Sequence, residues 1–484
     1  MPGVPLRIAV DDPAVVDGLA RIRVQQHVPG PHPAGAVAEA KAAAARVLAA
    51  LDDGGRRDAR AIELITIDPA GSRDLDQALH IELRAGGRGW RVRYAIADVA
   101  AFVTPGGPLD AACWDRGLTF YLPDGRASLH PAVLGEDAGS LLPDRDRAAV
   151  LWTVDLDADG AVAAATVERA AVRSRAQLTY EDAQARLDAG TAPESLALLR
   201  EVGEARRRQE EARGGVSLDL PVQRVEPVDD GYRIAFEATV PAMGWNAQIS
   251  LLVGIVAAER MVDAGIGLLR TMPPPPADVV ETVRRTARAL GVAWPPGAAY
   301  ADVVRDLDGD VPAEAALLAL AARGLRGAGY LALPAAAAAA DGPGALEHAA
   351  VAARYAHVPA PLRRLGDRYA TEVCLAVEAG MRPPVWVADG LAGLPDALQR
   401  AGGRESGASR AAVDLAEALV LRPLVGRRLE VAVVAADDEG STVVCRDPAV
   451  QARVAGHRLA LGEQVAVRVE AADPVERTVT LRPV

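Results

Sequence analysis

Residues 66–77 read Thr-Ile-Asp-Pro-Ala-Gly-Ser-Arg-Asp-Leu-Asp-Gln and place three carboxylates on one short loop. The apolar residues before Asp68 predict a strand that ends there, and the Pro/Gly pair predicts a turn. Asp74 and Asp76 are two residues apart in the extended stretch that follows, so they share a face. Crowded carboxylates raise one another's pKa unless a cation holds them, and Mg²⁺ prefers oxygen ligands. The loop is therefore a candidate metal site, although Gln77 closes it with a neutral amide.

Three other interpretations of this loop compete with a metal site. The acids could serve a solvated turn, or one of them could cap a neighbouring element. A calcium loop of the EF-hand type is excluded, because it needs an acid or amide at position 78 and Gly at 79, where this chain has Ala78 and Leu79.

Composition limits the class of protein. Half of the 484 residues are hydrophobic, and the net charge is −12. These values predict a globular protein of two to four domains, and they oppose non-specific binding to nucleic acid. The three cysteines, Cys113, Cys374 and Cys445, are far apart. They predict neither a zinc module nor a disulfide framework and fit the reducing cytoplasm. We expect no signal peptide and no apolar run of membrane-spanning length.

The pattern along the chain predicts an α+β fold in three parts. Residues 1–55 form a short leader with a strand at Leu6–Val10 and an Ala-rich helix that ends near Asp53. Residues 56–422 form the main domain, which is rich in strands to about 175 and then mainly helical. A short strand pair is expected within 216–236, around Asp229-Asp230-Gly231. Residues 423–484 read as four or five short strands, which fit either a small barrel of the OB type or a generic β appendage.

Several blocks of the chain, in order, resemble the ribonuclease II/ribonuclease R (RNB) family of exoribonucleases. The acidic loop resembles the family loop that runs Thr-Ile-Asp and then Asp-x-Asp-Asp-Ala. The other blocks are YAIADVAAFV (94–103), LDAACWDRGLTFYLPDGRASLHPAVLGEDAGSLLP (109–143), AAVRSRAQLTYEDA (170–183), GGVSLDLP (214–221) and YAHVPAPLRRLGDRY (355–369). The resemblance covers about residues 55–480. It implies an RNB-type catalytic domain with a mixed sheet and surrounding helices, followed by an OB-type RNA-binding barrel.

The resemblance also implies an activity and a set of site residues. It implies hydrolysis of single-stranded RNA from the 3′ end to nucleoside 5′-monophosphates, with Mg²⁺ or Mn²⁺ as the cofactor. The implied metal ligands are Asp68, Asp74, Asp76 and Gln77, the implied catalytic residues are Asp76 and Arg363, and the implied RNA contacts are Tyr121, Arg364, His357 and Arg73. For Tyr121 the alternative is a position in the core. For Arg363 and Arg364 the alternative is a structural ion pair. We further expect a cytoplasmic monomer with no membrane association.

The chain departs from the family pattern at several positions. Gln77 replaces the fourth loop acid, Ala95 replaces a His, Ala360 and Leu365 replace the Ser and Tyr of the SPIRRY-type motif, and Gly254 replaces a helical Asn. The leader is too short for two cold-shock barrels. Two functions therefore stay open: an active, shortened exoribonuclease, or an impaired relative that binds single-stranded RNA without cutting it. A metal-dependent phosphodiesterase acting on DNA or a small nucleotide is a third candidate.

Overall fold

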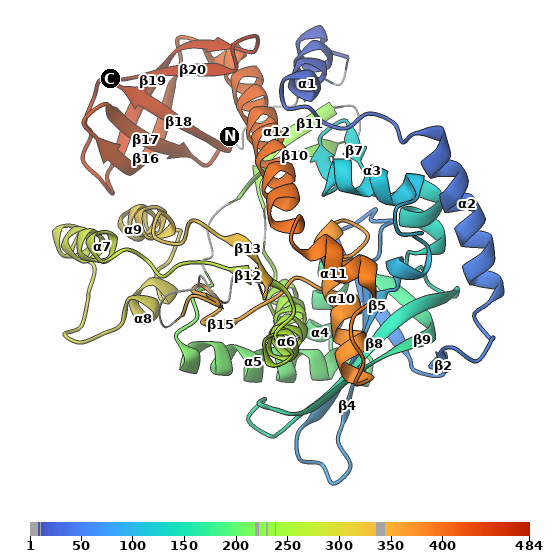
Figure 1. Ribbon diagram of the computed structural model, residues 1–484. Coiled ribbons are helices and arrows are strands. Elements are labelled where there is room, and N and C mark those ends of the chain that lie inside the picture. Colours follow the sequence, from blue (N-terminus) through green and yellow to red (C-terminus); the bar gives the residue numbers. More distant parts are fainter. Residues whose placement is uncertain (1–7, 10, 218–221, 229–230, 238, 335–343) are drawn as a thin grey trace.

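The computed structural model describes residues 8–9, 11–217, 222–228, 231–237, 239–334 and 344–484. Parts of three predicted features lie outside these ranges: the ends of the Leu6–Val10 strand, the Asp229-Asp230 pair and the second half of GGVSLDLP. The described chain forms an α+β body with a small β-barrel at its C-terminal end (Figure 1).

Six strands form the central sheet of the body, in the order β2-β9-β3-β4-β5-β8. Their bounds are β2 Arg57–Asp58, β3 Leu64–Ile67, β4 Gln77–Leu83, β5 Trp90–Ala97, β8 Asp146–Leu156 and β9 Val162–Leu178. β9 runs parallel to β3 and antiparallel to β8, so β9-β3-β4-β5-β8 close into a ring. The predicted mixed sheet is confirmed. The β8–β9 turn uses Gly160, whose φ of 81° suits glycine.

The N-terminal segment packs along the body. α2 (Ala34–Ala49) buries a stripe of small side chains, including Ala36 and Ala40, in the core that lies over the sheet. α1 (Pro13–Gln25) buries apolar residues against the long helix α12 (Leu394–Leu421). The sequence predicted α2 but not α1. Two start signals for α1 were present, since the Asp12 side chain caps the helix and Pro13 opens it.

Helices cover the sheet, as the pattern after residue 176 predicted. α5 (Glu194–Arg213), α6 (Pro241–Asp263) and α10 (Leu365–Glu378) pack together, and α5 and α10 also contact the sheet. The remaining helices are α3 Pro108–Arg116, α4 Tyr180–Asp188, α7 Ala277–Ala289, α8 Tyr300–Arg305, α9 Pro312–Ala322 and α11 Val385–Leu391. α4 begins after Thr179, which forms a reciprocal capping box with Asp182.

Four antiparallel strand pairs complete the body. β10 (Gln223–Val228) and β11 (Gly231–Phe236) form the pair expected within 216–236, and β1 (Ile8–Ala9) joins their outer edge. The other pairs are β6 Phe120–Leu122 with β7 Gly125–Ala127, β12 Gly267–Thr271 with β13 Gly329–Leu333, and β14 Glu347–His348 with β15 Ala353–Arg354.

α6 corrects the expectation that no apolar run reaches membrane-spanning length. Pro241–Asp263 passes that test by length and composition. Most of its apolar window is buried inside the fold, where it packs against α5 and α10. A core helix passes the same test, so the finding is weak evidence for a membrane.

The C-terminal strands form the expected small barrel. β16 Arg428–Asp437, β17 Gly440–Cys445, β18 Val450–Ala455, β19 Gln464–Asp473 and β20 Thr478–Pro483 follow the order β18-β17-β16-β19-β20. The edge strands β18 and β20 lie against each other, which closes the barrel around its own apolar core. α12 leads directly from the body to this barrel (Figure 1).

Candidate active site

The acidic loop joins two neighbouring strands of the central sheet. β3 ends at Ile67, and the N–H of Asp68 donates to the carbonyl of Leu178 on β9 (3.1 Å). The chain then turns through Gly71, which has a φ of 78°, and enters β4 at Gln77. β3 and β4 are antiparallel, so the two ends of the loop are held at the same end of the sheet.

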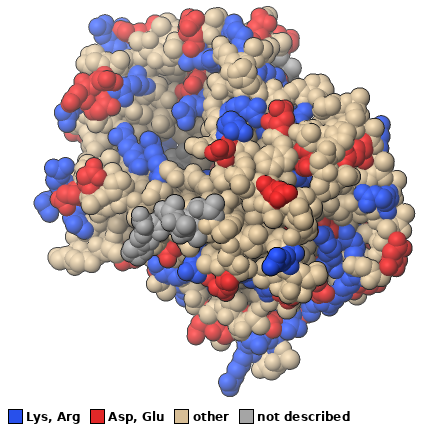
Figure 2. Space-filling view, in the orientation of Figure 1, with Lys and Arg blue, Asp and Glu red and all other residues tan. Residues whose placement is uncertain are grey.

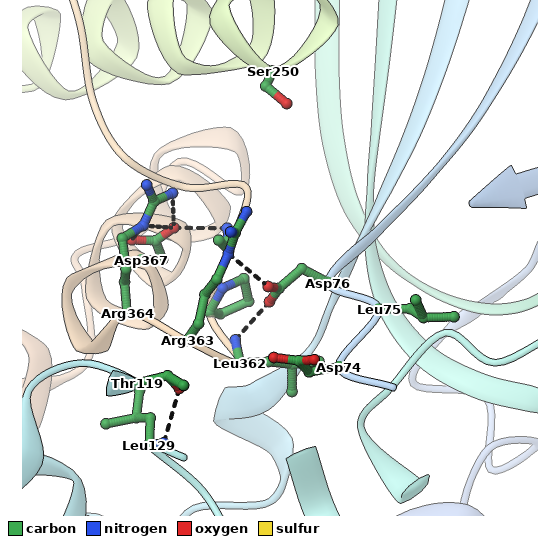
Figure 3. Close-up of polar contacts among 12 residues, drawn as sticks. Asp74, Leu75, Asp76, Thr119, Leu129, Ser250, Leu362, Arg363, Arg364 and Asp367 are labelled. Atoms are coloured by element: carbon green, nitrogen blue, oxygen red, sulfur yellow. Dashed lines mark hydrogen bonds and ion pairs between the residues drawn. The ribbon is translucent and has the colours of Figure 1, made fainter. Parts of the chain in front are cut away.

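Asp76 is the most deeply buried acid of the loop, with 2% of its surface exposed. Its Oδ1 accepts a hydrogen bond from the N–H of Leu362 (2.7 Å), and its Oδ2 lies 3.2 Å from Nε of Arg363 (Figure 3). Burial raises the pKa of Asp76 to about 8, although Arg363 and the Leu362 N–H both favour the charged form. A segment nearly 290 residues downstream in the chain thus supplies both polar partners of this carboxylate.

Asp74 is held by two residues that are partners across the β6–β7 hairpin. Tyr121 on β6 pairs in register with Arg126 on β7. The Tyr121 hydroxyl donates to Oδ2 of Asp74 (3.0 Å), and Nη1 of Arg126 lies 2.5 Å from Oδ1. Arg126 also pairs with Glu136 (2.9 Å). Arg126 was not among the site residues predicted from the sequence. The alternation of FYLPDGRA as a hairpin is the one signal that could have placed it beside Tyr121.

Asp68 and Gln77 carry buried oxygens that accept nothing from the described residues. These atoms are Oδ2 of Asp68 and Oε1 of Gln77. Burial raises the pKa of Asp68 to about 6, Arg363 opposes that rise and Asp74 adds to it. Buried acceptors without partners are costly, and a hard cation would satisfy them. The donor set therefore fits a divalent cation, with Asp68 and Gln77 as the oxygens that are free to bind it.

The described side chains do not form a ready-made metal cluster of acids. Among them, no group of three or more His, Cys, Asp or Glu is placed to hold an ion. The engagement of Asp74 and Asp76 with basic partners explains this result. The three loop acids nevertheless interact electrostatically. Asp74 raises the pKa of both Asp68 and Asp76, and Arg363 lowers both.

Arg363 projects from a loop, residues 360–367, that is fixed at several points. Asp367 accepts the N–H of Ala360 (2.7 Å) and both Nε and Nη2 of Arg364. The carbonyl of Arg363 accepts the N–H of Thr119 (3.0 Å). The pairing of Arg364 with Asp367 is what its structural alternative predicts, and an RNA contact by Arg364 stays a prediction.

His130 supports the same loop and was not singled out from the sequence. Its Nε2 lies 3.2 Å from the carbonyl of Pro361, so the proton is on Nε2. Its Nδ1 lies 3.3 Å from the thiol of Cys113, which is then the donor. Burial lowers the pKa of His130 to about 3, so the ring is neutral. This chain of contacts holds the backbone immediately before Leu362 and Arg363.

The remaining predicted RNA contacts differ in how accessible they are. Tyr121 is 47% exposed, so the core alternative for its ring is wrong. The exposed Arg73 is fixed through its carbonyl, which accepts the hydroxyl of Ser140 (2.6 Å). His357 is bonded to the hydroxyl of Tyr330 (2.7 Å), and burial holds its pKa well below the usual value. A neutral His357 offers no charge to a phosphate.

Comparison with known proteins decides the family. Residues 56–377 match the model of the RNB domain, and residues 427–484 match the RNase II-type exonuclease C-terminal S1 domain. The chain belongs to the RNB family. Its RNB match covers well over half of the sequence, and its C-terminal barrel is the S1 domain, which is of the OB type.

Individual RNB relatives are distant. Exosome complex exonuclease RRP44 homolog A of Arabidopsis thaliana is 30% identical over 250 residues, which are 49% of this chain and 26% of the relative. Ribonuclease R of Escherichia coli (strain K12) is 26% identical over 358 residues, covering 67% of this chain and 41% of the relative. The chain thus spans well under half the length of these curated proteins.

Solved structures agree on the RNB fold. The apo form of Mycoplasma genitalium RNase R superposes with a TM-score of 0.85 at 16% identity, covering 98% of this chain and 78% of that one. Yeast Ssd1, described as a pseudonuclease, superposes with a TM-score of 0.71 at 15% identity, covering 96% and 58%. At these identities the matches establish the fold alone.

One departure from the RNB pattern has a clear steric cause. A Cβ at Gly254 on α6 would lie 2.3 Å from the ring of Tyr355 and 2.6 Å from the carbonyl of Ala356. The carbonyl of Gly254 also accepts the N–H of Ala356 (3.1 Å). The strand-like segment that precedes the Arg363 loop therefore lies directly on the helix, and no side chain fits between them.

A groove of roughly 1030 Å³ lies away from the acidic loop. It runs between the S1 barrel, β11 and the start of α9, and none of the predicted site residues line it. Figure 2 shows this face hollowed beside the barrel, with basic and acidic side chains mixed around it. The lining charges are Arg233, Arg446, Glu237, Asp308, Asp310, Glu430 and Asp447.

Proposed function

We propose that this chain is a metal-dependent exoribonuclease that hydrolyses single-stranded RNA from its 3′ end and releases nucleoside 5′-monophosphates. The observation that carries the proposal is the geometry around Asp76. A buried carboxylate with a raised pKa lies against Arg363 and beside two further acids of one loop. Strongly perturbed carboxylates next to a specific charge partner are typical of catalytic sites.

Different residues of the site would bind the metal, the scissile phosphate and the terminal base. Asp68 and Gln77 would hold Mg²⁺ or Mn²⁺, which would supply an acidified water and neutralise phosphate charge. Asp76 holds Arg363 through Nε, which leaves the terminal nitrogens of a half-exposed guanidinium to bind the scissile phosphate and stabilise charge in the transition state. The exposed ring of Tyr121 would stack on a base near the 3′ end.

The relatives support this reaction class, but they do not establish that this chain catalyses the reaction. The two relatives are an exosome exonuclease homologue and a ribonuclease R, but each is more than twice as long as the part that this chain matches. The full activity of those proteins does not carry over with the fold. A cytoplasmic monomer is the expected setting and stays a prediction.

A catalytically impaired RNA-binding protein is the second candidate. Two observations favour it: Gln77 stands where the family has an acid, and Asp76 is paired with Arg363. Its fold also matches a solved pseudonuclease. Against it, a site without catalysis has no need of a buried carboxylate cluster, which destabilises the fold when it is not compensated.

The deciding experiment follows a 5′-labelled single-stranded oligoribonucleotide with Mg²⁺, with Mn²⁺ and with EDTA. The exoribonuclease gives a ladder of shorter products and nucleoside 5′-monophosphates, in either metal and not in EDTA. Asp76→Asn is the matched inactive variant, because it keeps the size of the side chain. Tight binding without shortening would identify the impaired relative, and shortening of an equivalent DNA strand alone would identify a different phosphodiesterase. If the chain neither binds nor shortens the oligoribonucleotide, an RNA function is rejected.

A further inference from the structure

We propose that Arg126 takes the place of a second metal ion at the acidic loop, so that the site holds a single divalent cation and Asp74 is not one of its ligands. The proposal rests on the proposed function, because it concerns the metal of that same site. Many phosphodiester-cleaving enzymes clamp the phosphate between two metal ions. The contacts of Asp74 argue for a different arrangement here.

Both oxygens of Asp74 are already engaged by the β6–β7 hairpin. Nη1 of Arg126 lies 2.5 Å from Oδ1, and the hydroxyl of Tyr121 lies 3.0 Å from Oδ2. The two donors are register partners, so the hairpin presents them together. An ion bound by Asp74 would have to displace a charge-assisted bond and compete with a guanidinium at close range.

Arg126 is also held from its other side. Its Nη2 lies 2.9 Å from Glu136, in the π-helical turn Leu134–Ala138. The guanidinium therefore bridges two carboxylates and supplies a fixed positive charge next to Asp74. Its side chain is 23% exposed, so the ion pair is shielded from much of the solvent.

Two buried oxygens of the loop are left over for an ion. Oδ2 of Asp68 and Oε1 of Gln77 are buried and accept nothing from the described residues. Asp68, Asp74, Asp76 and Glu136 lie with two guanidiniums, those of Arg126 and Arg363. This set has a formal charge of −2, which one divalent ion balances.

The test counts ions on the full chain without RNA. Mn²⁺ is titrated into the protein while free Mn²⁺ is followed by electron paramagnetic resonance. The same titration is done on Asp68→Asn, and the ions that this variant no longer binds are assigned to the site. We expect one ion for the unaltered chain and two for Arg126→Met, in which Asp74 is released. Arg126→Lys keeps a cation and should stay at one. Arg88→Met, an exposed arginine of the β4–β5 hairpin, is the control and should also stay at one.

A second pair of variants tests the ligand assignment even if Arg126→Met does not fold. Asp74→Asn should change Mn²⁺ affinity less than about twofold, whereas Asp68→Asn should weaken it at least tenfold. Two ions on the unaltered chain, one ion on a folded Arg126→Met, or a tenfold loss with Asp74→Asn would each overturn the inference. An unchanged ion count with weaker RNA binding would make Arg126 a phosphate contact instead. No Mn²⁺ binding at all would reject the metal-dependent function itself, which is a distinct outcome.

Discussion

Arg363 meets Asp76 through Nε, at 3.2 Å from Oδ2, while the N–H of the preceding residue, Leu362, binds the other oxygen. One loop of the RNB fold, residues 360–367, therefore both orients the Asp76 carboxylate and positions the Arg363 guanidinium beside it. The contact places a positive charge against the buried carboxylate through Nε, and the proposed function assigns the terminal nitrogens of the guanidinium to the substrate phosphate.

Arg363→Ala should lower turnover far more than RNA affinity. Loss of a donor aimed at transition-state charge costs about 10²–10³ in rate, and we expect the dissociation constant for RNA to change less than about fivefold. Single-turnover cleavage and equilibrium binding, measured on the same oligoribonucleotide, separate the two effects. Arg363→Lys keeps the positive charge and loses the two-pronged guanidinium. Its turnover should lie between that of the unaltered chain and that of Arg363→Ala. Equal losses in rate and affinity would make Arg363 a simple binding residue.

Gln77→Asp should lower the Mg²⁺ concentration required for half-maximal rate. Oε1 of Gln77 is a buried acceptor that accepts no hydrogen bond from the described residues, and a carboxylate there would add a negative ligand. The measurement is the rate at a series of Mg²⁺ concentrations. Gln77→Glu is the companion variant, because it adds the same charge on a side chain of the original length. An unchanged metal requirement in both would place residue 77 outside the metal shell.

Tyr121 has two separable roles, a ring that faces solvent and a hydroxyl on Asp74. Tyr121→Ala should weaken RNA binding by about 1–3 kcal/mol, the usual range for one stacked base. Tyr121→Phe keeps the ring and should retain most of that affinity. Fluorescence anisotropy of a labelled oligoribonucleotide measures both. If Phe and Ala lose the same affinity, the hydroxyl rather than the ring is responsible.

Two glycines of α6 should respond to Ala in opposite directions. Gly254→Ala forces a Cβ to within 2.3 Å of the Tyr355 ring, so we expect a loss of about 1–3 kcal/mol in the free energy of unfolding. A Cβ at Gly244 would meet no atom of the described residues within 4 Å, so Gly244→Ala should stabilise the helix by about 0.5–1 kcal/mol. Chemical denaturation of both variants provides the comparison. A neutral Gly254→Ala would show that the Tyr355 segment can move off the helix.

Glu417 should make the junction between the body and the barrel dependent on pH. Its Oε1 accepts the side chain of Gln223 and the N–H of Gln451, both at 2.6 Å. Burial raises its pKa to about 7 from a usual 4.5, although both hydrogen bonds oppose the rise. The folded state thus binds the proton more tightly than the unfolded chain. The stabilisation is complete below about pH 4.5 and is lost as the pH rises through 7.

Glu417→Gln tests this titration, because it keeps the acceptor and removes the charge. The variant should gain up to about 3 kcal/mol over the unaltered chain at pH 8.5 and little at pH 5. Denaturant midpoints at the two pH values measure the difference. The same gain at both would mean that Glu417 does not titrate between them.

Much of the fold followed from local sequence pattern. The apolar strand before Asp68 and the strand pattern beyond residue 423 each depend on a few neighbouring residues, and both are confirmed by the structure. α1 was missed although Asp12 and Pro13 mark its start, because short helices with a weak apolar stripe resemble loops in sequence.

The sequence also brought Asp68, Asp74 and Asp76 together, since they share one loop, and the order of blocks identified the RNB family. What the tertiary structure alone decided is the partner of each acid. Arg363 meets Asp76 and Arg126 meets Asp74 across long separations in the chain. Which arginine reaches which carboxylate depends on how the hairpin and the 360–367 loop pack on the sheet. Sequence pattern carries no information on such contacts, because they are set by packing between segments rather than by local periodicity.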